Sequence, residues 1–567
     1  MGTASAADIT VNNSTGPAAD FTSIQAAVDA ATDGDAIIVF SGIYTENIDV
    51  NKELNITSQS GNPKDTVVQP LDTNDYIFNV TANNVTISGF QVGGYMWDPW
   101  IYPMDTGIYL DGVQHNNINN NDVSGEEHAI SLNLSSNNTL SNNSGSITLR
   151  YSDNNLLNNN SPTGSITAVI LHNSDNNLLN DNNVTSSETG IHMDSSDNNI
   201  LIGNSIVAGD YCLSLYYSHN NTVSNNTVGL PIGGSGPGPC MDETISLVFS
   251  SNNTVNNNHI GRGGNTAIGL KSSSNNTVNN NYVGTSEVGI SMRSSKDNKV
   301  SNNTVNAYDA SFDLTNSSNN ALNDNIANED YFAPGSSFRL ESSSNNTLAG
   351  NIANRNEEFS IYLNNSMDNL IYNNYFNKTG NAYDNGSNTW NITKTEGTNI
   401  VGGPFLGGNY WSDYAGADTD GDGLGDTLLP YNSEGQISNG GDYLPLVIPP
   451  GPIPPIQATV DIRPGILNPK SEGEWITAYI ELPEGYDVND IEMSTIMLMG
   501  SIPAESFPSG AGDYDKDGKP DLMVKFDRKE LISLIGTGDV ELTVTGELTD
   551  GSIFEGTDTI WVLLKVK

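Results

Sequence analysis

The stretch HNSDNNLLNDNNV, residues 172–184, sets asparagines around two leucines and a valine, a pattern that neither a helix nor an ordinary strand requires. When the chain is aligned on such Asn-Asn pairs, with the first member as position 0, the motif returns along the sequence, most often after 22 residues. A fixed short period is the signature of a repeat architecture. Position 0 falls at His115, Asn137, Asn154, Asn176, Asn198, Asn220, Asn252, Asn275, Asp297, Asn319, Asn345 and Asp368.

The columns of this alignment indicate short strands. Positions +1 and +6 are Asn in every copy, position +3 is Ile, Leu or Val, and position −5 is Leu or Met. Inward residues two apart (−7 and −5, +1 and +3, +6 and +8) have the period of a strand, and the spacings of three and four that a helix needs are missing. Three short strands per repeat predict an all-β fold, a parallel β-helix of about 22 residues per coil.

The asparagines at +1 and +6 lie where such a coil bends. Asn tolerates the backbone conformation of a tight corner. Identical amides stacked from coil to coil can also hydrogen-bond to one another as ladders. We therefore interpret the Asn columns as structural.

The first part of the repeat region resembles a known family. The segments DFTSIQAAVDAATDGDAIIVFSGIYTENIDVNKELNITS (20–58) and ANNVTISGF (82–90), with the Asn repeats, are similar to secreted β-helix proteins of the carbohydrate-binding and sugar-hydrolase type, including NosD-like proteins of archaeal surfaces. The resemblance covers roughly residues 8–448 and implies a right-handed β-helix. Within it, Thr22 or Ser23 can cap a short helix that ends at Gly34 and covers the open first coil.

Composition shifts divide the chain further. We expect an N-terminal segment 1–20, a β-helix with its cap over 21–400, a C-terminal cap 401–448, a Pro-rich linker 449–457 and a small β-sandwich 458–567. The linker reads VIPPGPIPPIQ from residue 447, and stretches such as EWITAYIEL and VELTVTGEL beyond it are typical of strands.

Two acidic loops predict calcium sites. Carboxylates on alternate residues with a Gly at the sharp turn can wrap a Ca²⁺ ion. The first loop lacks the Glu of a full EF-hand at its twelfth position, where Leu429 stands. A solvated acidic turn is the alternative for each loop. The expected ligands are Asp418, Asp420, Asp422 and Asp426 in the first loop, and Asp513, Asp515, Asp517 and Asp521 in the second.

The charge and the cysteine content of the chain restrict where the protein can be located and which partners it can bind. The 67 acidic and 21 basic residues give a net charge of −46, which argues against nucleic acid and suits an extracellular surface. No apolar run is long enough for a membrane span. In a secreted protein Cys212 and Cys240 would form one disulfide, and two free buried thiols are the alternative.

The sequence gives little support for a catalytic site or a copper site. The six histidines occupy six different offsets in the repeat and form no column, whereas a copper site needs converging ligands. The outward offsets −6 and −4 form the best candidate face, but we find one carboxylate, Asp194, beside its histidines, and a glycosidase needs two. This face offers Arg150, His172, His192, Asp194, Tyr216, Lys271, Arg293, Arg339 and Tyr362.

Three insertions in the same turn of the repeat predict an aromatic ridge along the rod. Exposed aromatic side chains mark contact surfaces for sugar or protein, whereas loops folded back onto the rod are the alternative. The ridge residues are Tyr95, Trp97, Trp100, Tyr102, Tyr331 and Phe332.

The leading hypothesis is a secreted, non-catalytic structural protein of an archaeal cell surface. It would be stabilised by Ca²⁺ and would assemble with copies of itself into a layer, sheath or filament. The alternative is a β-helix protein that binds or cleaves polysaccharide.

Overall fold

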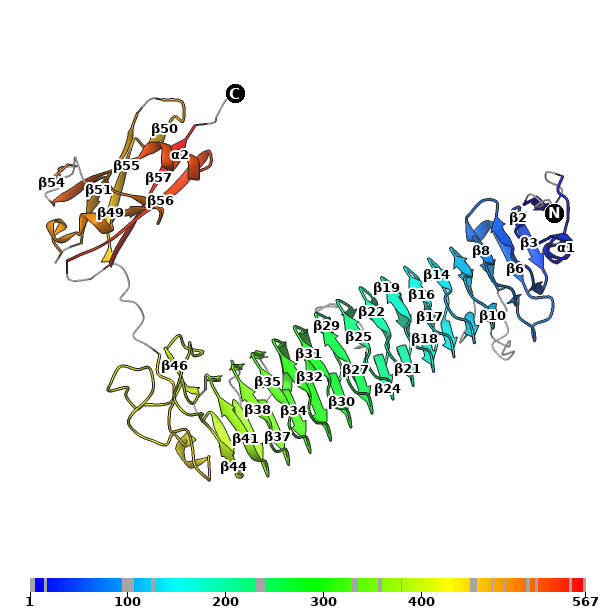
Figure 1. The fold of residues 1–567 in the computed structure, drawn as a ribbon, viewed down its shortest axis with the longest axis horizontal. Helices are drawn as coiled ribbons and strands as arrows, with labels where there is room; N and C mark the ends of the chain where they lie inside the picture. The colour runs from blue at the N-terminus through cyan, green and yellow to red at the C-terminus, as the bar shows by residue number, and fades with distance from the viewer. Residues whose placement is uncertain are drawn as a thin grey trace. The chain divides into compact units, whose positions relative to one another are not determined.

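The computed structural model describes residues 6–14, 18–93, 107–123, 128–229, 240–328, 335–354, 359–378, 380–448, 456–471, 473–483, 486–505, 510–514, 516, 519–549 and 553–563. The chain divides into two compact units, Met1–Ile448 and Pro449–Lys567. The first unit is a rod of stacked coils, coloured blue to yellow in Figure 1, and the second is a small β domain.

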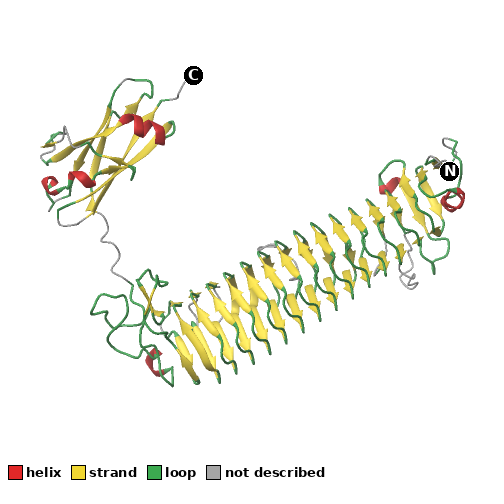
Figure 2. Cartoon of the chain, in the orientation of Figure 1, coloured by secondary structure: helices red, strands yellow, loops and turns green. Residues whose placement is uncertain are grey.

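Each strand of the rod pairs in parallel with its counterpart in the next coil. In the first face, for example, Leu157, Leu179 and Leu201 are register partners in three successive coils, and all three are buried. Figure 2 shows these strands stacked along the rod with loops at the corners. The expected all-β parallel β-helix is confirmed, and the inward columns form one continuous hydrophobic core.

The strands of the rod lie on three faces. The first face comprises β1 (Asp8–Val11), β2 (Ala36–Val39), β5 (Asn55–Ser58), β8 (Thr86–Ser88), β11 (Asn117–Asn119), β14 (Thr139–Ser141), β16 (Leu156–Asn158), β19 (Leu178–Asn180), β22 (Ile200–Ile202), β25 (Thr222–Ser224), β28 (Thr254–Asn256), β31 (Thr277–Asn279), β33 (Lys299–Ser301), β35 (Ala321–Asn323), β38 (Thr347–Ala349), β41 (Met367–Tyr372) and β44 (Ser387–Thr389). The second comprises β4 (Ile48–Val50), β7 (Phe78–Val80), β10 (Ile108–Asp111), β13 (Ile130–Asn133), β15 (Ile147–Arg150), β18 (Thr167–His172), β21 (Thr189–Asp194), β24 (Tyr211–Tyr216), β27 (Glu243–Val248), β30 (Thr266–Lys271), β32 (Tyr282–Arg293), β34 (Thr304–Thr315), β37 (Ser336–Glu341), β40 (Ile361–Asn364) and β43 (Ala382–Asp384). The third comprises β3 (Gly42–Thr45), β6 (Thr66–Gln69), β9 (Gln91–Val92), β12 (Asp122–Val123), β17 (Thr163–Gly164), β20 (Asn183–Ser186), β23 (Ser205–Val207), β26 (Thr227–Val228), β29 (His259–Arg262), β36 (Ile326–Asn328), β39 (Ile352–Ala353), β42 (Tyr375–Phe376) and β47 (Tyr410–Trp411), and β32 and β34 run across both the third and second faces.

The asparagine columns form the expected ladders inside the rod. Asn281 is typical: its Oδ1 accepts the backbone N–H and the Nδ2–H of Asn258, both at 3.0 Å. Its own Nδ2 donates to Oδ1 of Asn303 at 3.0 Å and to the backbone carbonyl of Val255 at 2.9 Å. One buried Asn side chain therefore provides hydrogen-bond partners for corner groups of the neighbouring coils. This requirement explains why no other residue type occurs at positions +1 and +6 of the repeats.

A serine column at position −2 forms a further ladder. The Oγ of Ser295 accepts the backbone N–H of Ser273 at 3.1 Å and donates to the carbonyls of Leu270 and Arg293, both at 3.0 Å. The same pattern recurs at Ser317. These serines are buried, so the column satisfies the backbone of a corner.

The helix α1 (Ile24–Ala30) packs on the first coil, against β1, β2 and β4. Ser23 caps its N-terminus, and the carboxylate of Glu46 accepts the N–H groups of Ile24 and Gln25. At the other end the ammonium of Lys52 donates to the helix carbonyls of Val28 and Asp29 and to that of the C-cap residue Ala31. The helix ends at Ala30, before the expected Gly34, because the next residue, Ala31, is already extended. The rod also begins at β1, ahead of the expected boundary at 21.

The C-terminal cap continues the rod beyond the last regular repeat. Both Asn columns gain a further member after irregular spacings, Asn388 after Asn369 and Asn409 after Asn374. The hairpin β45 (Thr395–Glu396) with β46 (Phe405–Leu406) follows, and the short helix η2 (Ser433–Gly435) lies near the end. Large buried rings cover the last coil, because Trp411 lies against Phe376, Trp390 and Tyr431.

The second unit is a small β-sandwich with one core between two sheets. One sheet is built from β49 (Thr459–Arg463), β51 (Trp475–Glu481), β55 (Asp521–Asp527) and β54 (Gly510–Gly512). The other contains β48 (Ile456–Gln457), β57 (Ile553–Val562), β56 (Gly538–Glu547), β52 (Met497–Leu498) and β53 (Ile502–Pro503), with β50 (Ile466–Leu467) on β57. The helix α2 (Arg528–Leu534), absent from our sequence-based expectation, follows β55 and is capped by Asp527, and the single turns η1 (Pro63–Asp65), η3 (Val488–Asp490) and η4 (Met493–Thr495) complete the secondary structure.

Candidate functional site: the polar face and the acidic loop

The second face of the rod carries the polar columns that the sequence singled out. Arg150, His172, Asp194 and Tyr216 are register partners in four successive coils, so the −4 column is a straight row along the rod. The inward residues between the polar positions are buried. The columns therefore point outward, as expected for alternation along a strand.

A histidine and a carboxylate meet in this row. Nδ1 of His172 lies 3.1 Å from Oδ2 of Asp194, and the other ring nitrogen lies 2.9 Å from the Asn173 amide. Next to them burial lowers the pKa of His192 below its usual 6.5. His192 is therefore neutral at pH 7.

The face carries further acidic groups that were not predicted from the sequence, among them Glu243 and Asp313. Glu243 is buried, accepts the hydroxyl of Ser246 at 2.5 Å and pairs with Lys271 at 2.8 Å. Glu243 lies ahead of the −6 and −4 offsets of its coil, at the end of an insertion. Asp313 stands directly before Arg339 in the −6 column and was readable from the alignment.

Arg339 joins two carboxylates. Its Nε lies 2.8 Å from Asp313 and its Nη1 lies 2.7 Å from Asp309. Within the described residues, Asp194, Glu243, Asp309 and Asp313 thus each contact a His, Lys or Arg partner. A glycosidase instead leaves one acid protonated and a second carboxylate available at the scissile bond.

The corner beside this face has an unusual backbone. Every residue at position −3 from Leu134 to Asn365 has a positive φ of 45–52°, and most are Asn or Ser, such as Asn173 and Ser195. Four bulky residues also occur there: Leu134, Tyr151, Tyr217 and Phe249. A left-handed conformation costs a residue with a Cβ roughly 1–2 kcal/mol, and bulky side chains adopt it rarely. All four are exposed, so burial does not offset this cost.

The acidic loop of the cap brings three carboxylates together. Oxygen atoms of Asp418, Asp420 and Asp426 lie within 4.8 Å of one another. Burial by itself would raise the pKa of Asp418, but N–H groups of Gly423, Gly421 and Asp422 bind the carboxylate and lower the pKa overall. A hydrogen bond from the Thr419 hydroxyl lowers the pKa of Asp426. Hard oxygen donors on a tight loop fit a Ca²⁺ ion.

The fourth expected ligand, Asp422, points elsewhere. Its carboxylate contacts the ammonium of Lys394, which also lies 4.3 Å from the centre of the Phe405 ring. In the second acidic loop, Asp515 and Asp517 lie outside the described residues. Asp521 accepts the N–H of Tyr514 at 2.8 Å, and Asp513 belongs to the same segment.

The ridge residues Tyr95, Trp97, Trp100, Tyr102, Tyr331 and Phe332 also lie outside the described residues. The two cysteines are joined. Cys212 and Cys240 form a disulfide with Cα atoms 5.4 Å apart, which ties β24 to the segment just before β27. No free cysteine is left.

The histidines do not fit a copper site. His128 contacts Thr148 at 2.8 Å, Nδ1 of His219 accepts the N–H of Ser251, and His259 stacks on Tyr282. Within the described part of the chain, the one group of three His, Cys, Asp or Glu ligands is the acidic loop. Copper favours imidazole, thiolate or thioether donors that converge, and these donors are dispersed.

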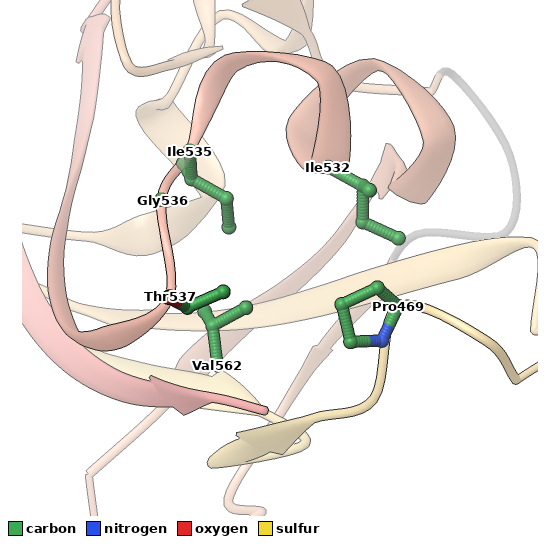
Figure 3. Close-up of a pocket in the computed structure, with 6 residues that line it drawn as sticks. All are labelled: Pro469, Ile532, Ile535, Gly536, Thr537 and Val562. Carbon is green, nitrogen blue, oxygen red and sulfur yellow. The ribbon is translucent and has the colours of Figure 1, made fainter. Parts of the chain in front are cut away.

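The sandwich unit has a small pocket of about 210 Å³. Figure 3 shows it between the end of α2 and the strand end at Val562. No titratable side chain lines it, so it offers no acid–base chemistry. Its lining residues are Pro469, Ile532, Ile535, Gly536, Thr537 and Val562.

Fold and site together define a parallel β-helix protein whose outer face is polar and whose ends are capped. The profile of the periplasmic copper-binding protein (NosD) family matches residues 79–240 and 241–416, more than half of the chain. The chain belongs to the NosD family. Among the described residues, no helix is long and apolar enough to span a membrane.

Other comparisons cover less or are more distant. A cell surface glycoprotein of Methanothermus fervidus is 36% identical over 115 residues, which are 19% of this chain and 17% of that protein. The chain thus spans about a sixth of this curated relative. Pectin methylesterase PemA of Erwinia chrysanthemi aligns with 46% of this chain and 82% of its own, at 10% identity and a TM-score of 0.27. The receptor-binding protein of bacteriophage Det7 aligns over 97% of this chain and 98% of its own, at 12% identity and a TM-score of 0.35.

Proposed function

We propose that this chain is a non-catalytic structural protein of an archaeal cell surface, in which the rod is a building element of a layer, sheath or filament. The observation that carries the proposal is that Asp194, Glu243, Asp309 and Asp313 on the polar face each contact a His, Lys or Arg side chain. Ladders of Asn and Ser give the coils of the repeat the same hydrogen-bonded corners. Such a rod suits a mechanical role better than a hydrolytic one.

The location is inferred from the relative. The matching protein of Methanothermus fervidus is named a cell surface glycoprotein, and the acidic composition suits an extracellular surface. The test is antibody labelling of intact cells of the source organism, with and without protease treatment of the surface. Labelling only after lysis would contradict a surface location.

We expect the protein to associate with itself through its sides. The helix α1 and the C-terminal cap cover the two ends of the rod, where exposed strand edges would otherwise pair with other chains. Because the net charge of −46 opposes assembly, salt or divalent cations should be required. Light scattering during a Ca²⁺ titration should show a mass above that of the monomer.

The ridge residues provide the variants for this experiment. Trp97→Ser with Trp100→Ser should lower the assembled mass, whereas Tyr443→Ser, an exposed aromatic in the cap, should not. A strictly monomeric protein at every Ca²⁺ and salt concentration would refute assembly.

We further propose that Ca²⁺ binds the acidic loop through Asp418, Asp420 and Asp426. A ligand that binds only the native state stabilises it by about 2.7 kcal/mol at a hundredfold excess over Kd. Thermal unfolding of the cap should therefore occur at lower temperature with a chelator than with Ca²⁺. The double variant Asp418→Asn, Asp420→Asn should abolish the difference, and Glu434→Gln, an exposed acid of the same cap, should retain it. Superimposable curves with and without the chelator would exclude a structural calcium site.

A further inference from the structure

Four aromatic residues, Tyr151, Tyr216, Tyr217 and Phe249, form an exposed strip at the corner of the polar face. The rings of Tyr217 and Phe249 are stacked, with centroids 5.0 Å apart and an interplanar angle of 11°. Tyr216 stands edge-on to both, and Tyr151 stands edge-on to His172 at 5.9 Å. We call this set the aromatic strip.

Neither the backbone nor the core explains these residues. Three of the four, all except Tyr216, occupy the left-handed corner position, where the coils between them have Asn173 and Ser195. Asn is the residue that this conformation favours, and a bulky residue there is a genuine outlier. The side chains are about half exposed, so they add little to the core. Unfavourable backbone geometry retained at a surface cluster points to a role in binding.

Polar groups lie between the two ends of the strip. Tyr151 and Tyr217 are three coils apart, roughly 14 Å at the usual strand spacing. The intervening coils present the His172–Asp194 pair, and Ser195 donates its hydroxyl to Asp194 at 3.0 Å. Flat aromatic surfaces thus alternate with hydrogen-bonding groups along the direction of the rod.

The strip also has positive charge at both ends. Arg150 lies beside Tyr151 at one end, and Arg293 lies two coils beyond Phe249 in the same −4 column, after Lys271; both arginines are exposed. Within the described chain neither forms an ion pair, although the protein has 67 acidic residues to 21 basic ones. Two unpaired guanidinium groups on so acidic a protein complement a ligand that bears carboxylates, which Arg binds in bidentate fashion.

We propose that the aromatic strip is a binding site for a carboxylated polysaccharide, which lies along the rod. The apolar faces of sugar rings pack on the aromatic rings, the hydroxyl groups bond to Asp194 and Asn173, and the carboxylates pair with Arg150 and Arg293. A linear polymer with repeating units fits a linear site in a way that a compact ligand does not. This inference goes beyond the proposed function and does not depend on where the rod is located or whether it assembles.

The test uses the purified full chain and oligosaccharides of matched length, with hexagalacturonate as the acidic probe and galactohexaose as the neutral one. Calorimetric titration at low salt should show tighter binding of the acidic probe, with an affinity that falls as salt is added. Arg150→Gln should reduce this preference. Equal affinity for both probes, or no binding of hexagalacturonate, hexaguluronate and hyaluronan oligomers, would overturn the proposal.

The decisive variant is Tyr217→Asn with Phe249→Asn. It should weaken binding by about tenfold or more, as expected when central aromatic contacts are removed. It should also melt no lower than the wild type, because Asn suits the left-handed corner. A merely structural role for these rings predicts a lower melting temperature and unchanged affinity, which would refute the site.

Two controls accompany this variant. Tyr308→Asn removes an exposed tyrosine from β34 of the same rod, outside the left-handed corner, and it should leave the affinity unchanged. Leu134→Asn relieves a bulky left-handed residue outside the strip and should raise the melting temperature. If the double variant instead dissociates an oligomer and binds the oligosaccharide as before, the strip is a contact between copies and the proposal fails.

Discussion

Replacing Asn281 by leucine is expected to lower the free energy of unfolding by about 3 kcal/mol or more, because it leaves several buried groups without partners. The backbone N–H and the amide of Asn258 lose their acceptor, and the carbonyl of Val255 loses its donor. Each such group costs about 1–3 kcal/mol when it is buried and unpaired. Chemical denaturation measures the loss, and hydrogen exchange should locate it in the coils that contain Asn258 and Asn303.

The matched control is Asn279→Leu, the same change two residues earlier. Asn279 is half-buried on the outer side of β31, and its Oδ1 has no hydrogen-bond partner. Its column also contains Ile202 and Tyr372 in other coils, so an apolar residue is tolerated there. If both variants were equally stable, the ladder would contribute nothing beyond the packing of its side chains.

Acidification from pH 8 to pH 5 is expected to stabilise the C-terminal cap through Asp442. This carboxylate is fully buried, and burial raises its pKa to about 6, although N–H groups of Asn409, Trp411 and Leu444 donate to it. The folded pKa is higher than the ordinary 3.8, so the native state binds the proton more tightly than the unfolded chain. Stability therefore increases as the pH falls through 6, by up to about 3 kcal/mol in all, and the increase is complete below the unfolded pKa.

The measurement is the unfolding of the cap as a function of pH, with Asp442→Asn for comparison. Because the chain carries a net charge of −46, acid also relieves general repulsion, and only the difference between the two slopes reports on Asp442. The wild type should gain more stability between pH 7 and pH 5 than the variant. Glu434→Gln, an exposed acid in the same cap, should follow the wild type. Parallel slopes for wild type and Asp442→Asn would contradict the raised pKa.

The architecture of the rod could be predicted because the residues of each column recur at a nearly fixed spacing in the sequence. A column such as that of Asn182 and Asn204 needs only one spacing to be recognised, and the structure confirms the hydrogen bonds that the spacing implies. The serine column is also present in the sequence, but the role of its hydroxyl groups is evident only in the structure, where Ser295 bridges backbone groups of neighbouring coils. Residue spacing identifies a column of the repeat, but the direction in which a serine hydroxyl points depends on the folded structure.

The sites were less predictable, for reasons that differ between them. Asn388 and Asn409 continue the ladders after intervals of 19 and 35 residues, which no constant period would find. Glu243 reaches the polar face from the end of an insertion, so its place depends on how the preceding segment returns to the coil. In the acidic loop, Asp422 has the right spacing for calcium, but its carboxylate contacts Lys394, 28 residues earlier.

The sequence by itself determined the parallel β-helix, its Asn ladders and the division into a rod and a sandwich, because these follow from a period, from the alternation of a strand and from a change in composition. Only the tertiary structure decided which side chains share a site. The Glu243–Lys271 pair, the two carboxylates on Arg339 and the aromatic strip each join residues from different coils. The strip in particular depends on a backbone angle, since Tyr217 and Phe249 are ordinary exposed residues in the sequence and become exceptional only in a left-handed corner. The repeat period can be read along the sequence, whereas a binding site depends on how side chains are oriented in three dimensions.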